Sequence, residues 1–586
     1  MISDAFEHVK RNVAVTRKSN EAQQIRPHMN STVTSSRFKK PSPFVDCSNT
    51  NMKVSIEEHL QQLRSKATEL LLREDWNEYI NLYSRFISLC RSHLLAAGSG
   101  AASDYLHKTL CLALSHRAEA RFRSRDLPGA LEDCDNALDL DPTHLTSLLC
   151  KAKVFLELDR YSSASECLKL ALASRPSGGA ADVVRELLVR CRKLEAQSRT
   201  GSFDLSDWIL NGFSEKCPDL AEYIGPVEIR RSTNGGRGLF ATKNVEAGTP
   251  LVVTRAVVVR RGILPESSDR HGESARMVMW KDFIDKILDV AEKCSRTLCL
   301  IYHLSAATEQ GELDVPDIGL FKPEAAEELF VLKIKKPDVG RILKVLDVNC
   351  LREEGFSAGI HGNHSNYVGV GLWILPSFVN HSCSPNARRL HVGDWVVVHA
   401  SRDVKAGEEI TFAYFDVLLP LDDRRAMAKV WGFECSCERC RLEESVRFRQ
   451  ELRELEMVMK SGTNLDGVAV RLEEGMSRWA VKGKAKGFLR ASFWPAYSGV
   501  YESERLTRRC GRRIPAVSMA VQSVSEAVGG DERILRALLR RLKRGGGGDV
   551  MEMDKAMRLG RGTFGKIMKK AAMKALFELA LVHYCN

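Results

Sequence analysis

The stretch that decides the fold is SFVNHSCSPN, at residues 377–386 of the 586-residue chain. It sets an amide side chain, Asn380, beside an imidazole, His381, and closes with Cys383 and a Ser-Pro-Asn turn. An amide both donates and accepts hydrogen bonds, which suits the recognition of a polar ligand. Asparagine in a tight turn also satisfies backbone groups alone, so this stretch by itself assigns no ligand.

Three further motifs flank this stretch: GGRGLFA at 235–241, EEITFAYFD at 408–416 and WGFECSCERC at 431–440. The glycines of the first motif, Gly236 and Gly238, allow a ligand to approach the main chain closely, although Gly236 can instead serve only a hairpin turn. The second motif predicts a strand over Glu409–Phe415, in which Tyr414 shares a face with two apolar residues. Tyr414 is therefore a candidate either for catalysis or for the core.

The third motif concentrates cysteine. Cys435, Cys437 and Cys440 form C-x-C-x-x-C, whereas most of the other cysteines, of 17 in all, are scattered singly. This distribution indicates a reducing compartment and a metal site instead of a disulfide framework. A structural zinc ion takes four ligands in a tetrahedron, and this cluster supplies all but one of them. A metal-free cluster and a redox pair are the alternatives.

Together and in this order, the four motifs resemble the SET family of protein lysine methyltransferases, and the cysteine pattern is closest to the SET/MYND subgroup. The resemblance covers residues 226–441 and implies a β-rich domain in which segment 377–386 threads beneath the following strand as a pseudoknot. It implies methyl transfer from S-adenosylmethionine to a lysine of a histone or non-histone protein. The alternative is a catalytically inactive SET-derived scaffold for protein–protein interaction.

The resemblance also implies roles for individual residues. Tyr414 corresponds to the catalytic tyrosine, and Trp431 to the aromatic side chain that lines the lysine channel. An apolar channel lowers the pKa of the lysine amine because it disfavours the charged form. The implied zinc ligands are Cys383, Cys435, Cys437 and Cys440. The implied cofactor-binding residues are Gly236, Arg237, Gly238, Ser377, Val379, Asn380, His381, Tyr414 and Phe433.

The chain departs from the SET/MYND pattern in several places. Between Arg255 and Asn380 it holds too few cysteines for a second zinc module, so the MYND finger is absent and the partners it would recognise are not implied. Asn349-Cys350-Leu351 stands where those proteins have Asn-Ser-Phe, an element of their cofactor and lysine sites. Arg237 stands where close relatives often have asparagine.

Upstream of this region, small residues and proline recur with a period of 34 residues, the period of tetratricopeptide (TPR) repeats. The recurring positions are Ala118, Ala130, Ala137 and Pro142, then Ala152, Ala164, Ala171 and Pro176. Such arrays bind a peptide or protein along a concave face, or serve as a structural platform. Family members that bind chaperone tails carry Lys, Arg and Asn where this chain has Ser115, Glu119 and Cys150, so that ligand is not implied.

The predicted organisation is multidomain α+β. Turn signals predict two hairpins, Val227–Arg231 with Arg237–Ala241 and Ala387–Val392 with Trp395–Ala400. A β-branched run predicts a further strand over Leu251–Val259. The predicted parts are a disordered tail over 1–53, a TPR-like α-solenoid over 54–200, a β-rich SET domain over 226–418 with a helical insert at about 260–350, a post-SET zinc segment over 419–441 and a helical region over 442–586.

Two patterns in the C-terminal region imitate nucleotide and nucleic-acid sites. Gly560-x-Gly562-x-x-Gly565 matches a dinucleotide fingerprint, but a predicted helix precedes it, whereas such a motif must follow a strand. RALLRRLKR at 536–544 is basic and amphipathic, which is more typical of a solvated helix face than of a nucleic-acid site. Gly545–Gly548 predicts a flexible break between helices.

Charge and hydropathy narrow the classes of function further. The net charge of +12 suits an acidic or nucleic-acid partner, but so mild a balance is typical of a solvated surface. A zinc-containing nucleic-acid-binding protein stays as a further alternative. No apolar run approaches the roughly 20 residues that cross a bilayer, and no secretory signal is visible, so no membrane association is expected. The pattern leaves both a nuclear and a cytoplasmic location open.

Overall fold

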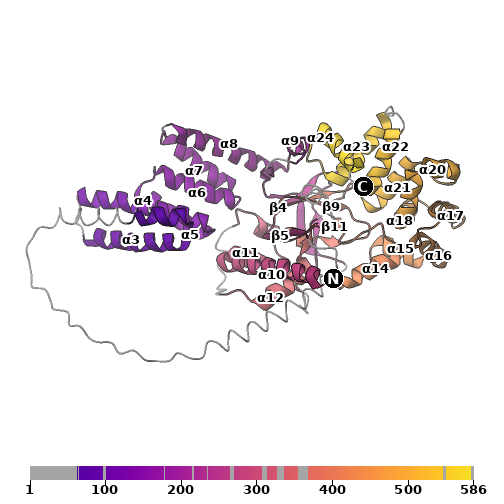
Figure 1. Cartoon of the computed structure of the whole chain (residues 1–586), viewed down its shortest axis with the longest axis horizontal. Helices are drawn as coiled ribbons and strands as arrows, with labels where there is room; N and C mark the ends of the chain where they lie inside the picture. Colours follow the sequence, from indigo (N-terminus) through magenta and orange to yellow (C-terminus); the bar gives the residue numbers. More distant parts are fainter. Residues whose placement is uncertain are drawn as a thin grey trace, which may run out of the picture. The chain divides into compact units, whose positions relative to one another are not determined.

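The computed structural model of the protein describes residues 63, 65–96, 101–176, 178–213, 217–233, 235–263, 270–306, 313–325, 336–353, 367–544 and 550–582. These residues form two compact units, one up to Glu195 and one from Ala196 onward, coloured along the chain from indigo to yellow in Figure 1. The tail predicted over 1–53 and the break predicted at Gly545–Gly548 lie outside the described residues. None of the described helices combines the length and the apolar character needed to cross a membrane.

The first unit consists of helices that pack on their neighbours in the chain. The helices are α3 (Trp76–Ala96), α4 (Ala101–Arg123), α5 (Leu127–Leu140), α6 (Leu145–Glu157), α7 (Tyr161–Ala173) and most of α8 (Gly179–Thr200). The six alanines of the 34-residue period are fully buried, because small side chains let paired helices approach closely. Asp126 begins α5 by accepting a hydrogen bond from the Gly129 N–H. The unit is the predicted TPR-like α-solenoid.

From residue 223 onward, short strands form three sheets with the orders β1-β4-β10-β9, β2-β3-β11-β8 and β5-β7-β6. The strands are β1 (Tyr223–Ile224), β2 (Val227–Arg231), β3 (Arg237–Ala241), β4 (Pro250–Arg255), β5 (Val258–Ile263), β6 (Leu351–Arg352), β7 (Tyr367–Leu372), β8 (Asn380–His381), β9 (Ala387–Val392), β10 (Trp395–Ala400) and β11 (Glu409–Phe412). Both predicted hairpins are confirmed, because β2 pairs with β3 and β9 with β10 in antiparallel register over the predicted residues.

The run predicted as one strand over Leu251–Val259 is wrong as a single element, because it supplies two strands. β4 ends at Arg255, and the N–H of Ala256 then donates to the Asp394 carbonyl at 2.9 Å. The next N–H, of Val257, donates to the Leu372 carbonyl at 2.8 Å and leads into β5 of another sheet. An unbroken apolar run carries no mark of such a change of sheet.

The strand predicted over Glu409–Phe415 ends earlier, at Phe412. Beyond that point the N–H of Tyr414 donates to Nδ1 of the His381 ring at 3.0 Å instead of to a neighbouring strand. This side-chain acceptor ends the ladder and leaves Tyr414 just past the strand.

Segment 380–386 is tied to β11, which follows it in the chain. β8 pairs with β11 in parallel, with Asn380 opposite Thr411. The Asn386 side chain accepts a hydrogen bond from the Thr411 N–H at 2.8 Å and donates one to the Glu409 carbonyl at 2.8 Å. This lacing is the arrangement that the pseudoknot prediction requires, and it brings Asn380 and His381 to the end of β11.

The insert, where described, is helical and shares the core of the strands. It contains α10 (Arg270–Lys293), α11 (Ser295–Tyr302), the short 3₁₀ helix η1 (Ile318–Phe321) and α12 (Val339–Asn349). Phe283, Ile287 and Ile342 are fully buried in the same cluster as the strand residues Leu251 and Leu372. A second 3₁₀ helix, η3 (Leu375–Phe378), leads from β7 into β8.

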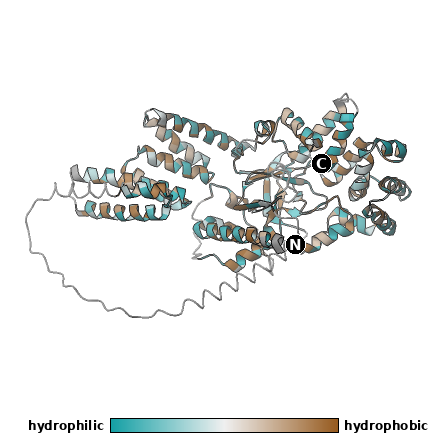
Figure 2. Ribbon diagram, in the orientation of Figure 1, coloured by the Kyte–Doolittle hydropathy of each residue, from teal (hydrophilic) through white to brown (hydrophobic). Residues whose placement is uncertain are grey.

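The C-terminal helices share a core with β9 and β10, where Val392 and Val397 pack in the same cluster as Phe488 and Tyr497. In Figure 2, hydrophobic and hydrophilic residues are interleaved along these helices, as expected where each helix buries one face. The helices are α14 (Leu421–Val430), α15 (Glu438–Ser445), α16 (Arg449–Lys460), α17 (Leu465–Arg478), α18 (Lys484–Ser492), α19 (Trp494–Glu502), α20 (Glu504–Cys510), α21 (Val517–Val528), α22 (Glu532–Arg544), α23 (Val550–Phe564) and α24 (Lys570–Val582).

The two imitating patterns fall in these helices. RALLRRLKR lies in α22, with two of its leucines, Leu538 and Leu539, buried. Gly560 and Gly562 lie inside α23, and a Cβ at Gly562 would stand 2.5 Å from the Ser401 carbonyl oxygen. The glycines therefore serve close packing, and no dinucleotide-binding loop forms there.

Candidate active site and metal centre

Asn380, on β8, is held by its own amide hydrogens. Nδ2 donates to the Arg237 carbonyl at 3.0 Å and to Oε1 of Glu409 at 2.7 Å. With both hydrogens used, Oδ1 is left as an acceptor, and it has no hydrogen bond among the residues that the structure describes. An ammonium group is the kind of ligand that such an oxygen recognises.

Glu409 is a site residue that the sequence does not single out, because the EEITF pattern predicts only a strand. Its Oε2 accepts a hydrogen bond from the Ser232 hydroxyl at 3.0 Å, while Oε1 holds Asn380. A Cβ at position 238 would stand 2.3 Å from Oε1. The close approach of this carboxylate, more than any turn, therefore explains Gly238. Gly236 differs, since its φ of +71° favours glycine and its surroundings are open.

His381 and Tyr414 are coupled through their own atoms. The His381 Nδ1 accepts from the Tyr414 N–H, and the Tyr414 hydroxyl donates to the Val379 carbonyl at 2.9 Å. Burial raises the pKa of the Tyr414 hydroxyl to about 12, and the nearby Arg389 opposes this only partly. Tyr414 is therefore neutral at physiological pH and acts as a hydrogen-bonding group, not as a base.

The predicted aromatic residues gather around this pair. The ring centroid of Tyr414 lies 5.0 Å from that of Trp431 and 6.0 Å from that of Phe433. His381 lies 5.4 Å from Phe433 and stacks on Phe415 at 4.2 Å. The structure thus brings Tyr414, His381, Trp431 and Phe433 together into one aromatic wall.

The side chains of Arg237 and Ser377, both predicted to bind cofactor, are engaged elsewhere. The Arg237 guanidinium donates to the Asp314 carbonyl at 3.0 Å and lies over the Phe378 ring, 5.1 Å from its centroid. The Ser377 hydroxyl donates to the Trp373 carbonyl at 2.8 Å. Of these two residues, the structure brings the Arg237 carbonyl, and not its side chain, to Asn380. Val379 is fully buried and offers its carbonyl to Tyr414.

The departing element Asn349-Cys350-Leu351 ends α12 and begins β6. The Asn349 amide donates to the carbonyls of Ser305 at 2.8 Å and Val345 at 2.7 Å. The Ser377 hydroxyl, whose single hydrogen is directed to the Trp373 carbonyl, also lies 3.4 Å from the Asn349 carbonyl oxygen. The element therefore supports η3, which leads to Asn380, and Leu351 is buried in the core.

Four cysteines meet at one point. The sulfur atoms of Cys383, Cys435, Cys437 and Cys440 lie within 4.8 Å of one another. A zinc ion with four thiolates spaces its sulfur atoms about 3.8 Å apart, so this group has the chemistry and the size to hold a metal ion. Hydrogen bonds from the other three thiols lower the pKa of the Cys383 thiol. The His381 Nε2 also lies 3.3 Å from the Cys383 sulfur, which links the cluster to the aromatic wall.

Beside the cysteines lies a buried ionic network that the sequence analysis also missed. Arg424 donates to Glu443 at 2.5 Å and to the Cys440 sulfur at 3.2 Å. Arg439 donates to Glu443 at 2.8 Å and to the Cys383 carbonyl at 3.1 Å. All three charged side chains are buried. The only signal in the sequence was their position beside the cysteine motif.

Comparisons with known proteins agree with this geometry. Residues 236–415 match the family model described as SET domain, so this part of the chain is a SET domain. The chain is 26% identical over 412 residues to a "Methyltransferase" of Gibberella zeae, covering 66% of this chain and 52% of that protein. It is 40% identical over 78 residues to "Histone-lysine N-methyltransferase SMYD3" of Mus musculus, covering 13% of this chain and 18% of that protein.

The chain spans about half the length of the first relative and less of the second. Among solved structures, "TPR2B-domain:pHsp70-complex of yeast Sti1" matches with 22% identity and a TM-score of 0.19, covering 23% of this chain and 98% of that one.

Proposed function

We propose that this protein transfers a methyl group from S-adenosylmethionine to a lysine side chain of a protein, either a histone or a non-histone protein. The observation that carries the proposal is the convergence of Asn380, His381 and Tyr414, which are drawn together by the lacing of segment 380–386 to β11. Relatives named as methyltransferases support the same class of reaction.

The residues present fit S-adenosylmethionine. Asn380 Oδ1 and the Glu409 carboxylate supply acceptors for the ammonium end of an amino acid, and the open, positive-φ backbone at Gly236 leaves space beside them. Phe433 offers a flat apolar face for an adenine ring. When bound, S-adenosylmethionine supplies an electrophilic methyl group on a sulfonium.

Tyr414 positions the attacking amine. Its hydroxyl hydrogen is committed to the Val379 carbonyl, so the lone pairs of its oxygen are available to orient an N–H of the substrate lysine. The amine must reach this site without its proton, against a pKa near 10.4 in water. The aromatic side chains of Trp431 and Phe433 form an apolar surface that favours the neutral amine. In-line alignment of the amine with the methyl group supplies most of the rate acceleration.

We propose zinc for the four cysteines, with Cys383, Cys435, Cys437 and Cys440 as ligands. The metal would tie the tail that carries Trp431 and Phe433 to the segment that carries His381. The helical repeats would recruit or orient the protein substrate, in the nucleus or the cytoplasm.

Calorimetric binding of S-adenosylmethionine to the folded, zinc-loaded protein tests the proposal. We expect saturable binding that Asn380→Ala abolishes and that Asn136→Ala, the same change in the repeat unit, leaves intact. Failure of the wild-type protein to bind would contradict the proposal and would leave the catalytically inactive scaffold as the better account.

A further inference from the structure

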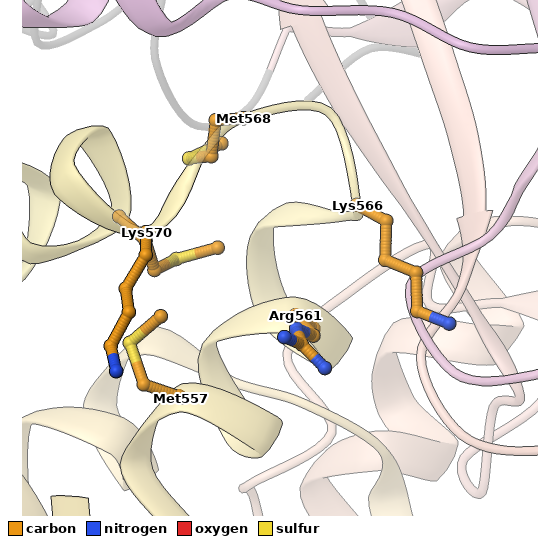
Figure 3. Close-up of a pocket in the computed structure, with 6 residues that line it drawn as sticks. Met557, Arg561, Lys566, Met568 and Lys570 are labelled. Carbon is orange, nitrogen blue, oxygen red and sulfur yellow. The ribbon is translucent and has the colours of Figure 1, made fainter. Parts of the chain in front are cut away.

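A cavity of about 330 Å³ lies in the C-terminal helices, and the proposed methyl transfer does not use it. The end of α23, the loop that follows and the start of α24 form its walls (Figure 3). Its lining combines three sulfur-containing and three basic side chains with no acidic one: Met557, Met568, Met573, Arg561, Lys566 and Lys570. The volume lies at the small end of the range for ligand pockets, roughly 300–1,000 Å³.

Two of the three cations lack a counter-charge. Lys566 pairs with Glu246, with Nζ and Oε2 2.7 Å apart. In the part of the chain that the structure describes, the side chains of Arg561 and Lys570 make neither a hydrogen bond nor an ion pair. Close by, Lys569 is paired with Asp204 at 3.0 Å. The cavity lining together with Glu246 therefore keeps two positive charges that protein groups do not balance.

The arrangement in Figure 3 agrees with this division of roles. Arg561 lies between Lys566 and Lys570, and the Lys566 amine points away from the other two. Lys570 is also the first residue of α24, a helix of 13 residues. The partial positive charge at the start of a helix adds to the field of the side chains.

The cavity wall is fixed by backbone contacts with distant parts of the unit. The Lys566 N–H donates to the Gly248 carbonyl at 2.6 Å, and the Lys569 N–H donates to the Ser206 hydroxyl at 2.8 Å. Between them, the Ile567 carbonyl accepts from Leu205 at 2.8 Å. A wall held in this way loses little conformational entropy when a ligand binds.

We infer that this cavity binds a phosphate monoester whose phosphate is carried on an apolar group. A monoester phosphate bears about −1.5 to −2 charges at neutral pH, which matches the two unbalanced cations. The Arg561 guanidinium suits two-point contact with phosphate oxygens, and Lys570 adds a compact charge. The flexible, polarisable methionines adapt to the apolar group.

The glycines of the Gly560-x-Gly562-x-x-Gly565 pattern take no part in this binding, because they pack against protein. The phosphate can come from a small metabolite or from a phosphorylated side chain of a protein. The inference does not depend on methyl transfer.

Calorimetry of the full-length protein with phenyl phosphate tests the site. Arg561→Gln combined with Lys570→Gln should weaken binding about 10- to 100-fold, because charged hydrogen bonds are lost. Lys574→Gln, an exposed change on α24 outside the cavity lining, should leave affinity unchanged. All three proteins should melt at the same temperature, since the substituted side chains are exposed.

Two further ligands, inorganic phosphate and a phosphoserine peptide, test how much the apolar group contributes to affinity and whether the phosphate comes from a small molecule or a protein. Inorganic phosphate should bind more weakly than phenyl phosphate, because it leaves the methionines unused. A phosphoserine peptide with apolar flanks that binds more tightly than phenyl phosphate would assign a protein source, and weaker binding would assign a small molecule. The inference is overturned if phenyl phosphate does not saturate the wild-type protein, or if it binds the double variant equally well.

Discussion

Two groups of basic side chains in the SET-containing unit differ in their surroundings. Arg424 and Arg439, beside the cysteines, are fully buried, share Glu443 and also donate to backbone or sulfur acceptors. Arg561 and Lys570, at the cavity, are exposed and have no acidic partner in the described chain. Buried charge is tolerated only when every group is paired, whereas exposed cations on a rigid wall cost little.

The first group of basic side chains stabilises the fold, whereas the second group is available to bind a ligand. The first group ties α14 and α15 to the cysteine cluster, and so to the tail that carries Trp431 and Phe433. In the described chain, the side chains of Arg561 and Lys570 make no hydrogen bond or ion pair that would support the fold. Changes to the first should therefore reduce stability, and changes to the second should alter binding alone.

The largest effect is expected from Cys437→Ser. Metal analysis should find about one zinc ion per chain in the wild-type protein and none in the variant, because one of the four ligands is lost. The melting temperature should also fall, because metal binding stabilises the folded state. Cys294→Ser removes a cysteine outside the cluster and should change neither quantity. Full zinc content in the Cys437 variant would remove the metal centre from the account.

Glu443→Gln should come next. It leaves two buried guanidinium groups without their shared carboxylate, so the free energy of unfolding should fall by about 3–5 kcal/mol, measured by urea denaturation. Glu444→Gln, one residue further and exposed, should cost no more than about 1 kcal/mol. Equal losses of unfolding free energy in the two variants would mean that the buried arginines beside the cysteines do not depend on Glu443.

His399 sharpens the comparison, since it is a buried basic group kept without charge. It lies where α23 packs on β10, and burial, aided by the nearby Arg388, lowers its pKa to about 4. The unfolded chain gains the proton near pH 6.5, so the free energy of unfolding should fall as the pH drops from 6.5 toward 4, by up to about 3 kcal/mol. In His399→Gln, this contribution to the pH dependence of the free energy of unfolding should vanish. An unchanged pH dependence would mean that other groups cause it.

The smallest effect is expected from Glu409→Gln, which keeps the shape and removes the charge beside Asn380. S-adenosylmethionine affinity should fall by about tenfold as one charged contact is weakened, and the melting temperature should hold. Glu434→Gln, an exposed change near the aromatic wall, serves as the control. An unaltered affinity for S-adenosylmethionine would mean that Glu409 has only a structural role.

The sequence alone predicted the features that depend on local pattern. Both hairpins followed from their turns, and the buried alanines of the repeat followed from a fixed period. The order of four motifs predicted the SET domain. The convergence of Cys383 with the three later cysteines came from the resemblance, and the geometry agrees with it.

The missed features depend on contacts between distant segments. Glu409 meets Ser232 and Gly238 only after β11 has paired with β3. The early end of that strand at Phe412 reflects a hydrogen bond to His381, which no propensity encodes. The cavity likewise needs Lys566 to be anchored on Gly248, more than 300 residues away in the sequence.

The most direct test of the account is methyl transfer itself. Full-length, zinc-loaded protein is incubated with methyl-labelled S-adenosylmethionine and a protein extract, and labelled methyllysine is measured after hydrolysis. The account predicts methyllysine with the wild-type protein, a loss of about 100-fold or more in Tyr414→Phe because alignment is lost, and unchanged cofactor binding in that variant. Cofactor binding without any methyllysine, or full activity in Tyr414→Phe, would contradict it.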